Sequence, residues 1–281
     1  MTTSLVNASK HDGVMVLELS NPPANTYSYE MMRELDAHVL EARFDAAVHA
    51  IVITGAGGAS SAGDGRSPKG AAPKAEFFCA GADIGMLEKA DPYFKYNFCL
   101  HANETLCRLE QTPKLVIAAI NGHCVGGGLE VALACDLRIA RAGAGKMGLP
   151  EVSLGVLPGT GGTQRLARAL GRSKAIELMA EGATFSIEEA KSLGLVNAVI
   201  DAPAGEFRAR ALEYARRFVP PGKASRAVGL IKRAVTTGLE VGIEQGLALE
   251  RELQQRLFEA DDAREGISAY NARRPPQFKG K

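Results

Sequence analysis

The amino-acid sequence predicts an α/β protein, in which a core of alternating strands and helices is followed by a helical C-terminal region. Short apolar runs typical of buried strands recur over the first 200 residues. Segments with apolar residues at helical spacing separate these runs, and beyond Pro203 only helical spacing is found. Strands alternating with helices, then helices alone, indicate an α/β core of residues 1–200 and a helical region of residues 201–281.

Composition limits the class of protein. The 281 residues include 46% hydrophobic and 23% charged residues, as in ordinary globular proteins that bury a full-sized core. A net charge of +1 gives no strong long-range field, so we expect neither a nucleic-acid nor a membrane-surface partner. The N-terminus shows no secretory pattern, and the five cysteines form no CxxC pair. We therefore expect reduced thiols, no metal site and a cytoplasmic location.

The first elements are defined by alternation, helical spacing and a change of composition. Residues 14–19 alternate as a strand that runs into an Asn-Pro-Pro turn, and residues 29–44 have helical spacing. Residues 50–54 form a β-branched strand, and a strand resumes at 76–79. Between them, residues 55–75 are rich in Gly, Ala, Ser and Pro, and we predict a flexible inserted surface loop.

The remaining elements continue the same rhythm, and a strand-strand-helix order returns loosely several times. We predict, in chain order, a helix at 93–109, a buried strand at 114–121, a glycine cluster, a helix to about Cys135, a strand at 136–141, a glycine-rich turn from Pro158, helices up to Leu193, a last strand at 195–200, and C-terminal helices in two parts separated by Pro220-Pro221.

A run of small residues, from Cys79 to Ile84, follows one of the strands. Small residues at a strand end let a backbone or a ligand approach closely, and an amide in such a turn can point at an oxygen. A tight turn chosen for packing is the alternative.

A second run, Asn121 to Glu130, joins a buried strand to a helix. Free N–H groups and the positive end of the helix dipole favour an oxyanion there, and Glu130 falls in the first helical turn. The alternative for Glu130 is favourable charge at a helix start. His123 in the same turn is interpreted as structural.

A third candidate, Glu151, stands among apolar residues after a proline. Burial there would raise its pKa, as general acid catalysis at neutral pH requires. The alternative is a glutamate at a helix start. Together the three runs place two amide donors and two carboxyls near one another, an arrangement suited to proton transfer beside a thioester carbonyl.

The phrases FCAGADI, AAINGHCVGGGLEVALACDLRIA and GLPEVSLGVLPGTGGTQRLAR resemble the signature segments of the enoyl-CoA hydratase/isomerase (crotonase) family. The resemblance runs from about Val14 to the tail DDAREGISAYNARR, apart from the inserted loop. It implies a spiral of repeated ββα units with C-terminal helices that build trimers or hexamers. It also implies an acyl-CoA substrate and no cofactor, since coenzyme A is part of the substrate.

Site residues implied by the resemblance are carried over by position. The amides of Ala82 and Gly127 would form an oxyanion hole, while Glu130 activates water and Glu151 delivers a proton to C2. The substrate and CoA contacts it implies are Ala80, Gly81, Asp83, Ile84, Gly126, Phe258 and Arg273. Because both glutamates are present, hydration of a 2-enoyl-CoA is favoured over the other reactions of the family.

Three alternatives are weighed against hydration. Another acyl-CoA reaction on the same scaffold, such as isomerisation, hydrolysis or a hydratase/lyase reaction, is the main rival. RNA binding is disfavoured because helix 29–44 is acidic on balance. A nicotinamide-dependent reductase is disfavoured because the run from Ile51 to Gly58 lacks the third glycine and the following helix of a dinucleotide fold.

Overall fold

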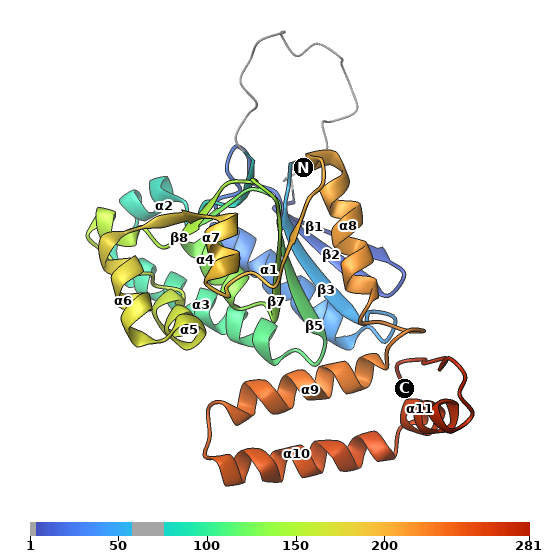
Figure 1. Ribbon diagram of the computed structural model, residues 1–281. Helices are drawn as coiled ribbons and strands as arrows, with labels where there is room; N and C mark the ends of the chain where they lie inside the picture. The colour runs from blue at the N-terminus through green and yellow to red at the C-terminus, as the bar shows by residue number, and fades with distance from the viewer. Residues whose placement is uncertain (1–3, 58–75) are drawn as a thin grey trace.

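The computed structural model describes residues 4–57 and 76–281, so most of the inserted loop predicted at 55–75 lies outside the described residues. Two sheets and the surrounding helices make up the protein (Figure 1). The strands are β1 Val6–His11, β2 Val14–Leu19, β3 Ala50–Gly55, β4 Phe77–Cys79, β5 Leu115–Ile120, β6 His123–Val125, β7 Leu137–Arg141, β8 Lys146–Gly148, β9 Thr184–Ser186 and β10 Ala198–Ile200. The helices are α1 Tyr29–Phe44, α2 Ile84–Lys89, α3 Pro92–Gln111, α4 Gly127–Leu133, the 3-10 helix η1 Glu151–Leu154, α5 Gly162–Leu170, α6 Arg172–Glu181, α7 Ile187–Ser192, α8 Ala204–Arg216, α9 Ser225–Gly238, α10 Ile243–Phe258 and α11 Asp261–Asn271.

The predicted spiral of ββα units is confirmed. The larger sheet has the order β1-β2-β3-β5-β7-β10 and is parallel except for the β1–β2 pair, while the smaller has the order β4-β6-β8-β9. The chain passes from β3 to β4, from β5 to β6 and from β7 to β8, entering helical structure after each pair. Each turn of the spiral thus adds one parallel strand to each sheet.

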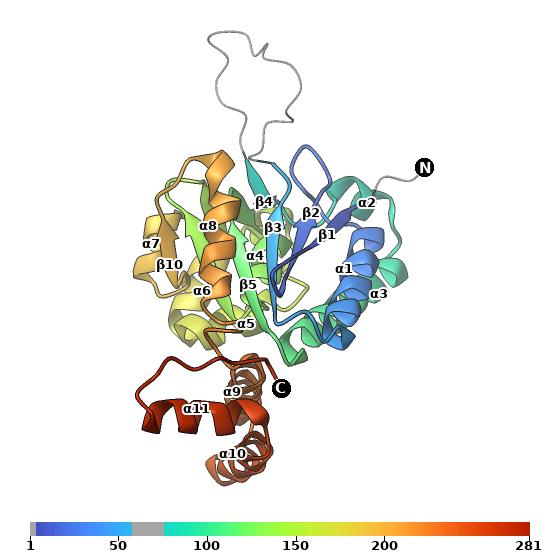
Figure 2. The same cartoon turned by 90° about the vertical axis from the view of Figure 1, so that its right-hand side faces the viewer.

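The larger sheet is covered on both faces, as strands of a parallel sheet require. Along β2, Val14 and Val16 pack with α8 on one face, while Met15 and Leu17 belong to the core under α1 and α3 on the other. Figure 2 shows α8 and the α1–α3 pair on opposite sides of the strands. Although α8 lies beyond residue 200, it is therefore a layer of the α/β core.

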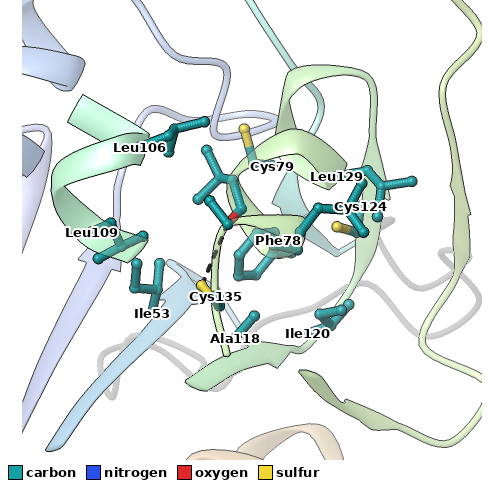
Figure 3. Packing of buried hydrophobic residues seen from close by; sticks show 14 of the residues in the cluster. Ile53, Phe78, Cys79, Leu106, Leu109, Ala118, Ile120, Cys124, Leu129 and Cys135 are labelled. Atoms are coloured by element: carbon teal, nitrogen blue, oxygen red, sulfur yellow. Dashed lines mark hydrogen bonds between the residues drawn. The ribbon is translucent and has the colours of Figure 1, made fainter. Parts of the chain in front are cut away.

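Core packing connects the two sheets beneath the cavity described below. Phe78 of β4 is fully buried and lies among side chains of β5 and α4, including Ala118 and Leu129 (Figure 3). Within the described ranges, no helix is both long enough and apolar enough to cross a membrane.

Several boundaries agree with the sequence prediction, and others correct it. Helix α1 has its predicted bounds, with the Ser28 side chain as N-cap, and Asp91 caps α3 in the same way. The last strand is shorter than the predicted 195–200, because Leu195 still donates to the carbonyl of Ala190 at the end of α7. Strands β1, β6, β8 and β9 were not predicted; three of them have only three residues.

Candidate active site

Three segments come together at one edge of the smaller sheet. Strands β4, β6 and β8 are parallel neighbours, so their carboxyl ends share an edge. The chain leaves these ends through Ala80–Ala82, through Gly126 and Gly127, and through Pro150 and Glu151. The topology therefore brings together the three runs that the sequence analysis singled out.

A cavity of about 490 Å³ opens at this edge. It is mostly apolar, and its lining comprises Tyr27, Ala80, Gly81, Ala82, Ile84, Leu87, Lys95, Phe98, Cys99, Val125, Gly126, Gly127, Glu130, Pro150, Glu151, Ser153, Leu154, Val156, Leu157, Gly159 and Thr160. An apolar pocket with a few converging polar groups is the usual form of a small-molecule site.

Two residues that line this cavity, Ala82 and Gly127, have backbone N–H groups that the described part of the chain leaves without an acceptor. Tyr27 bridges to Ala82 by donating to the Gly81 carbonyl (2.9 Å) and accepting from the Asp83 N–H (3.0 Å). These bonds engage the neighbours of Ala82 and leave its own N–H on the opposite side. Gly127 begins α4, where N–H groups lack partners within the helix. Among the described residues, neither the Ala82 nor the Gly127 N–H donates a hydrogen bond.

Glycine is required beside these amides. Gly126 has φ of 56°, in the left-handed region, and a Cβ there would lie 3.2 Å from Glu151 Oε1. A Cβ at Gly127 would lie 2.3 Å from Cε1 of Tyr27. The absence of these two side chains lets the Glu151 carboxyl and the Tyr27 ring pack directly on the turn.

Glu130 is buried and firmly bound. Its Oε1 accepts from the N–H groups of Thr160 (2.8 Å) and Gly162 (2.7 Å), and its Oε2 accepts from the Thr160 hydroxyl. Burial raises the pKa of Glu130, and these hydrogen bonds act in the opposite direction by stabilising the carboxylate. The hydrogen bonds therefore fix the position of the Glu130 carboxyl at the cavity, while its pKa stays above the ordinary value because burial has the larger effect.

Glu151 is held differently. Its Oε2 is buried and has no hydrogen-bond partner in the described part of the chain. Burial, with a smaller contribution from the charge of Glu130, raises the pKa of Glu151 to about 7. Its carboxyl is therefore partly protonated near neutral pH, so the site holds two carboxyls in unlike environments.

Most of the predicted contact residues line the cavity. Ala80, Gly81, Ile84 and Gly126 do so together with the four predicted catalytic and oxyanion-hole residues. Asp83 does not, because its side chain caps α2 by accepting from the Met86 N–H (3.0 Å).

Phe258 and Arg273 lie in the C-terminal region, away from the cavity. Phe258 borders a separate hollow of about 330 Å³ with Leu257 and Phe278, and Arg273 follows α11 with φ of 52°. Their contact with CoA stays a prediction.

The sequence analysis missed several lining residues. No sequence pattern indicated that Tyr27 or Thr160 would line a site, although Thr160 lies in the glycine-rich turn that begins at Pro158. Leu87 and Phe98 also line the cavity, although apolar residues at helical spacing do not by themselves distinguish a pocket lining from helix packing. His123 is structural as interpreted: its Nδ1 accepts from the Lys146 N–H (3.2 Å), and its ring lies against Phe77.

Fold and cavity together define a class of protein, a spiral ββα scaffold with two amides and two carboxyls around an apolar pocket. The enoyl-CoA hydratase/isomerase family matches residues 71–281. The chain is 34% identical over 275 residues to a short-chain-enoyl-CoA hydratase of Clostridium acetobutylicum, covering 98% of this chain and 97% of the relative.

Two further proteins are similar to this chain. A human mitochondrial methylglutaconyl-CoA hydratase is 40% identical over 205 residues, which cover 72% of this chain and 60% of the relative. The crystal structure of an enoyl-CoA hydratase from Geobacillus kaustophilus superposes with a TM-score of 0.89 at 42% identity, covering 100% of this chain and 98% of the other. The chain belongs to the enoyl-CoA hydratase/isomerase (crotonase) family.

Proposed function

We propose that this protein is an enoyl-CoA hydratase, which adds water reversibly and from one face to the 2,3 double bond of a 2-enoyl-CoA to give a 3-hydroxyacyl-CoA. The pair of unlike carboxyls beside two free amides is the observation that carries the proposal. Hydration needs one group that takes a proton from water and another that gives a proton to carbon, and two carboxyls in different environments supply both.

The proposed steps follow from the site. The thioester carbonyl accepts hydrogen bonds from the Ala82 and Gly127 N–H groups, which stabilise the charge that develops as an enolate. The Glu130 carboxylate takes a proton from the water attacking C3. Glu151, protonated in part near neutral pH, gives a proton to C2. Because the two carboxyls are coupled, their titration belongs to the pair.

The substrate class follows from the apolar lining. Leu87, Phe98 and Leu154 surround the space that an acyl chain would occupy. All three relatives named above are called enoyl-CoA or methylglutaconyl-CoA hydratases, which supports hydration. We also propose a homotrimer, or a hexamer formed by two trimers. The cytoplasmic location stays a prediction.

The test is the loss of absorbance of the conjugated thioester when protein is mixed with crotonyl-CoA. We expect hydration by the wild type and a loss of at least about 100-fold in kcat for Glu130→Gln and for Glu151→Gln. Glu206→Gln, on α8 across the larger sheet, is the matched control and should retain activity.

Product analysis separates the rival reactions. A 3-hydroxyacyl-CoA product supports hydration, whereas free CoA or a shifted double bond from the corresponding 3-enoyl-CoA would contradict it and indicate a hydrolase or an isomerase.

A further inference from the structure

Tyr27 occupies a position in the cavity that hydrophobic packing does not explain. It is 3% exposed, and its ring stacks on Phe98 with centroids 5.7 Å apart. A phenylalanine would make the same stack. The phenol oxygen, however, lies 3.1 Å from Thr160 Oγ1, which in turn binds Oε2 of Glu130.

Counting protons sets the direction of these bonds. When Glu130 is ionised, as the proposed base must be, its oxygens only accept, so the Thr160 hydroxyl donates its single proton to Glu130. Thr160 Oγ1 can then only accept from Tyr27, which makes the phenol the first donor. Burial raises the pKa of Tyr27 well above its ordinary value, so the phenol keeps its proton at any working pH.

The same tyrosine is fixed to the amide side of the site. Its main chain bridges the segment around Ala82, and its hydroxyl would lie 2.4 Å from a Cβ at Gly127. Tyr27 therefore packs against both residues of the candidate oxyanion hole and also contacts Thr160, which holds Glu130.

Charged and titratable groups on α5, η1, α3 and β4 lie near Glu130 and Tyr27. Arg165 of α5 lowers its pKa and donates to the Thr160 carbonyl (3.0 Å), while Glu151 of η1 is the nearby like charge. Cys99 of α3 lines the same cavity as Glu130, and burial raises the pKa of its thiol. Cys79 of β4 lies beside Tyr27, and burial raises the pKa of its thiol to about 12. Both thiols are therefore neutral at physiological pH, which leaves Arg165 and the hydrogen bonds to oppose the burial of the carboxylate.

We propose that Tyr27 is a positioning residue whose phenol, acting through the Thr160 hydroxyl, orients the Glu130 carboxylate and maintains its anionic form. Its effect on rate rests on the hydratase function proposed above, because Glu130 is the base of that reaction. Removing the phenol leaves Thr160 without its donor, so the bond from Thr160 to the carboxylate weakens.

The test compares Tyr27→Phe with Thr160→Val. We expect kcat on crotonyl-CoA to fall about tenfold in each, with KM within about twofold. Loss of a donor destabilises the anion, so the pKa of Glu130 rises. Because the base form is required, the acid limb of the kcat–pH profile should move up by about one pH unit.

Two controls separate this role from a structural one. Thr160→Ser keeps a hydroxyl and should restore both the rate and the acid limb. Tyr29→Phe removes a phenol that lies outside the cavity lining, beside Phe94 and His101, and should behave as wild type. A Tyr27→Phe protein with an unmoved acid limb, or with only KM changed, would overturn the proposal.

A second readout does not depend on activity. The protonated carboxyl band of Glu130, identified by infrared difference against Glu130→Gln, should titrate at higher pH in Tyr27→Phe than in wild type. Equal titration midpoints in the two proteins would refute the proposed action of Tyr27 through Thr160 on Glu130. If the wild type hydrates no enoyl-CoA, the proposed function fails, and this titration still decides the role of Tyr27.

Discussion

At the scale of single residues, the two carboxyls of the site differ in their hydrogen bonding. Glu130 accepts three hydrogen bonds, whereas Glu151 has a buried oxygen without a partner among the described residues. An unsatisfied buried polar atom costs stability, and its persistence is typical of a group needed for chemistry. The unpartnered Glu151 oxygen therefore costs stability, which agrees with the proton-transfer role proposed above.

That cost predicts a stabilising substitution. The pKa of Glu151 is about 7 in the folded protein and 4.5 as an ordinary side chain. A raised folded pKa contributes stability below pH 4.5 that is lost as pH rises to about 7. Glu151→Gln never ionises, so we expect it to raise Tm by about 2–4 °C at pH 8 and by much less at pH 5. Calorimetry at both pH values measures this, and an equal change at both would refute it.

At the scale of elements, α9 is attached to the core around its middle. Lys232 pairs with Asp136 (2.9 Å) and donates to the carbonyls of Leu109 and Lys114, and both side chains of the pair are largely buried. Gly229, one turn earlier, lies so close to the Pro113 carbonyl that a Cβ would be 2.2 Å from its oxygen. A Cβ at Gly238, the last residue of the helix, would meet nothing within 4 Å among the described residues.

These two glycines form a matched pair within one helix. Gly229→Ala should push α9 away from the Pro113 turn and lower the free energy of unfolding by about 1–3 kcal/mol. Gly238→Ala should change it by no more than about 1 kcal/mol, in the stabilising direction, because alanine is the better helix former. Chemical denaturation measures the free energy of unfolding of both variants. Equal changes would show that the close approach of Gly229 to Pro113 does not restrict the side chain at that position.

The same scale shows what the sequence predicts and what it leaves out. Residues 29–44 were predictable because sixteen residues sustain a helical period and Ser28 caps them. Strands β6, β8 and β9 were not, since three residues are too few to show alternation. Glu130 and Glu151 were found through their flanking glycines and proline. Tyr27 was not, because its role depends on Thr160, 133 residues away along the chain.

At the scale of the whole molecule, α9 and α10 lie side by side beneath the sheets, with α9 nearer the core (Figure 1). Large apolar side chains of this pair and its connecting turn are exposed in the single chain: Ile231, Val235, Leu239, Val241, Ile243 and Leu247. Such a group of exposed apolar side chains is typical of a surface that another protein copy covers.

This surface allows a test of the proposed trimer or hexamer. Light scattering of the wild type should give three or six times the mass of one chain. Leu239→Asp combined with Ile243→Asp should yield smaller species, because an interface would have to bury unpaired charges. Phe44→Asp replaces an apolar side chain that is 83% exposed at the end of α1, and should leave the assembly unchanged. A monomeric wild type would exclude the proposed assembly. A double variant of undiminished mass would place the contact elsewhere, because two unpaired charges in an apolar interface would destabilise the assembly strongly.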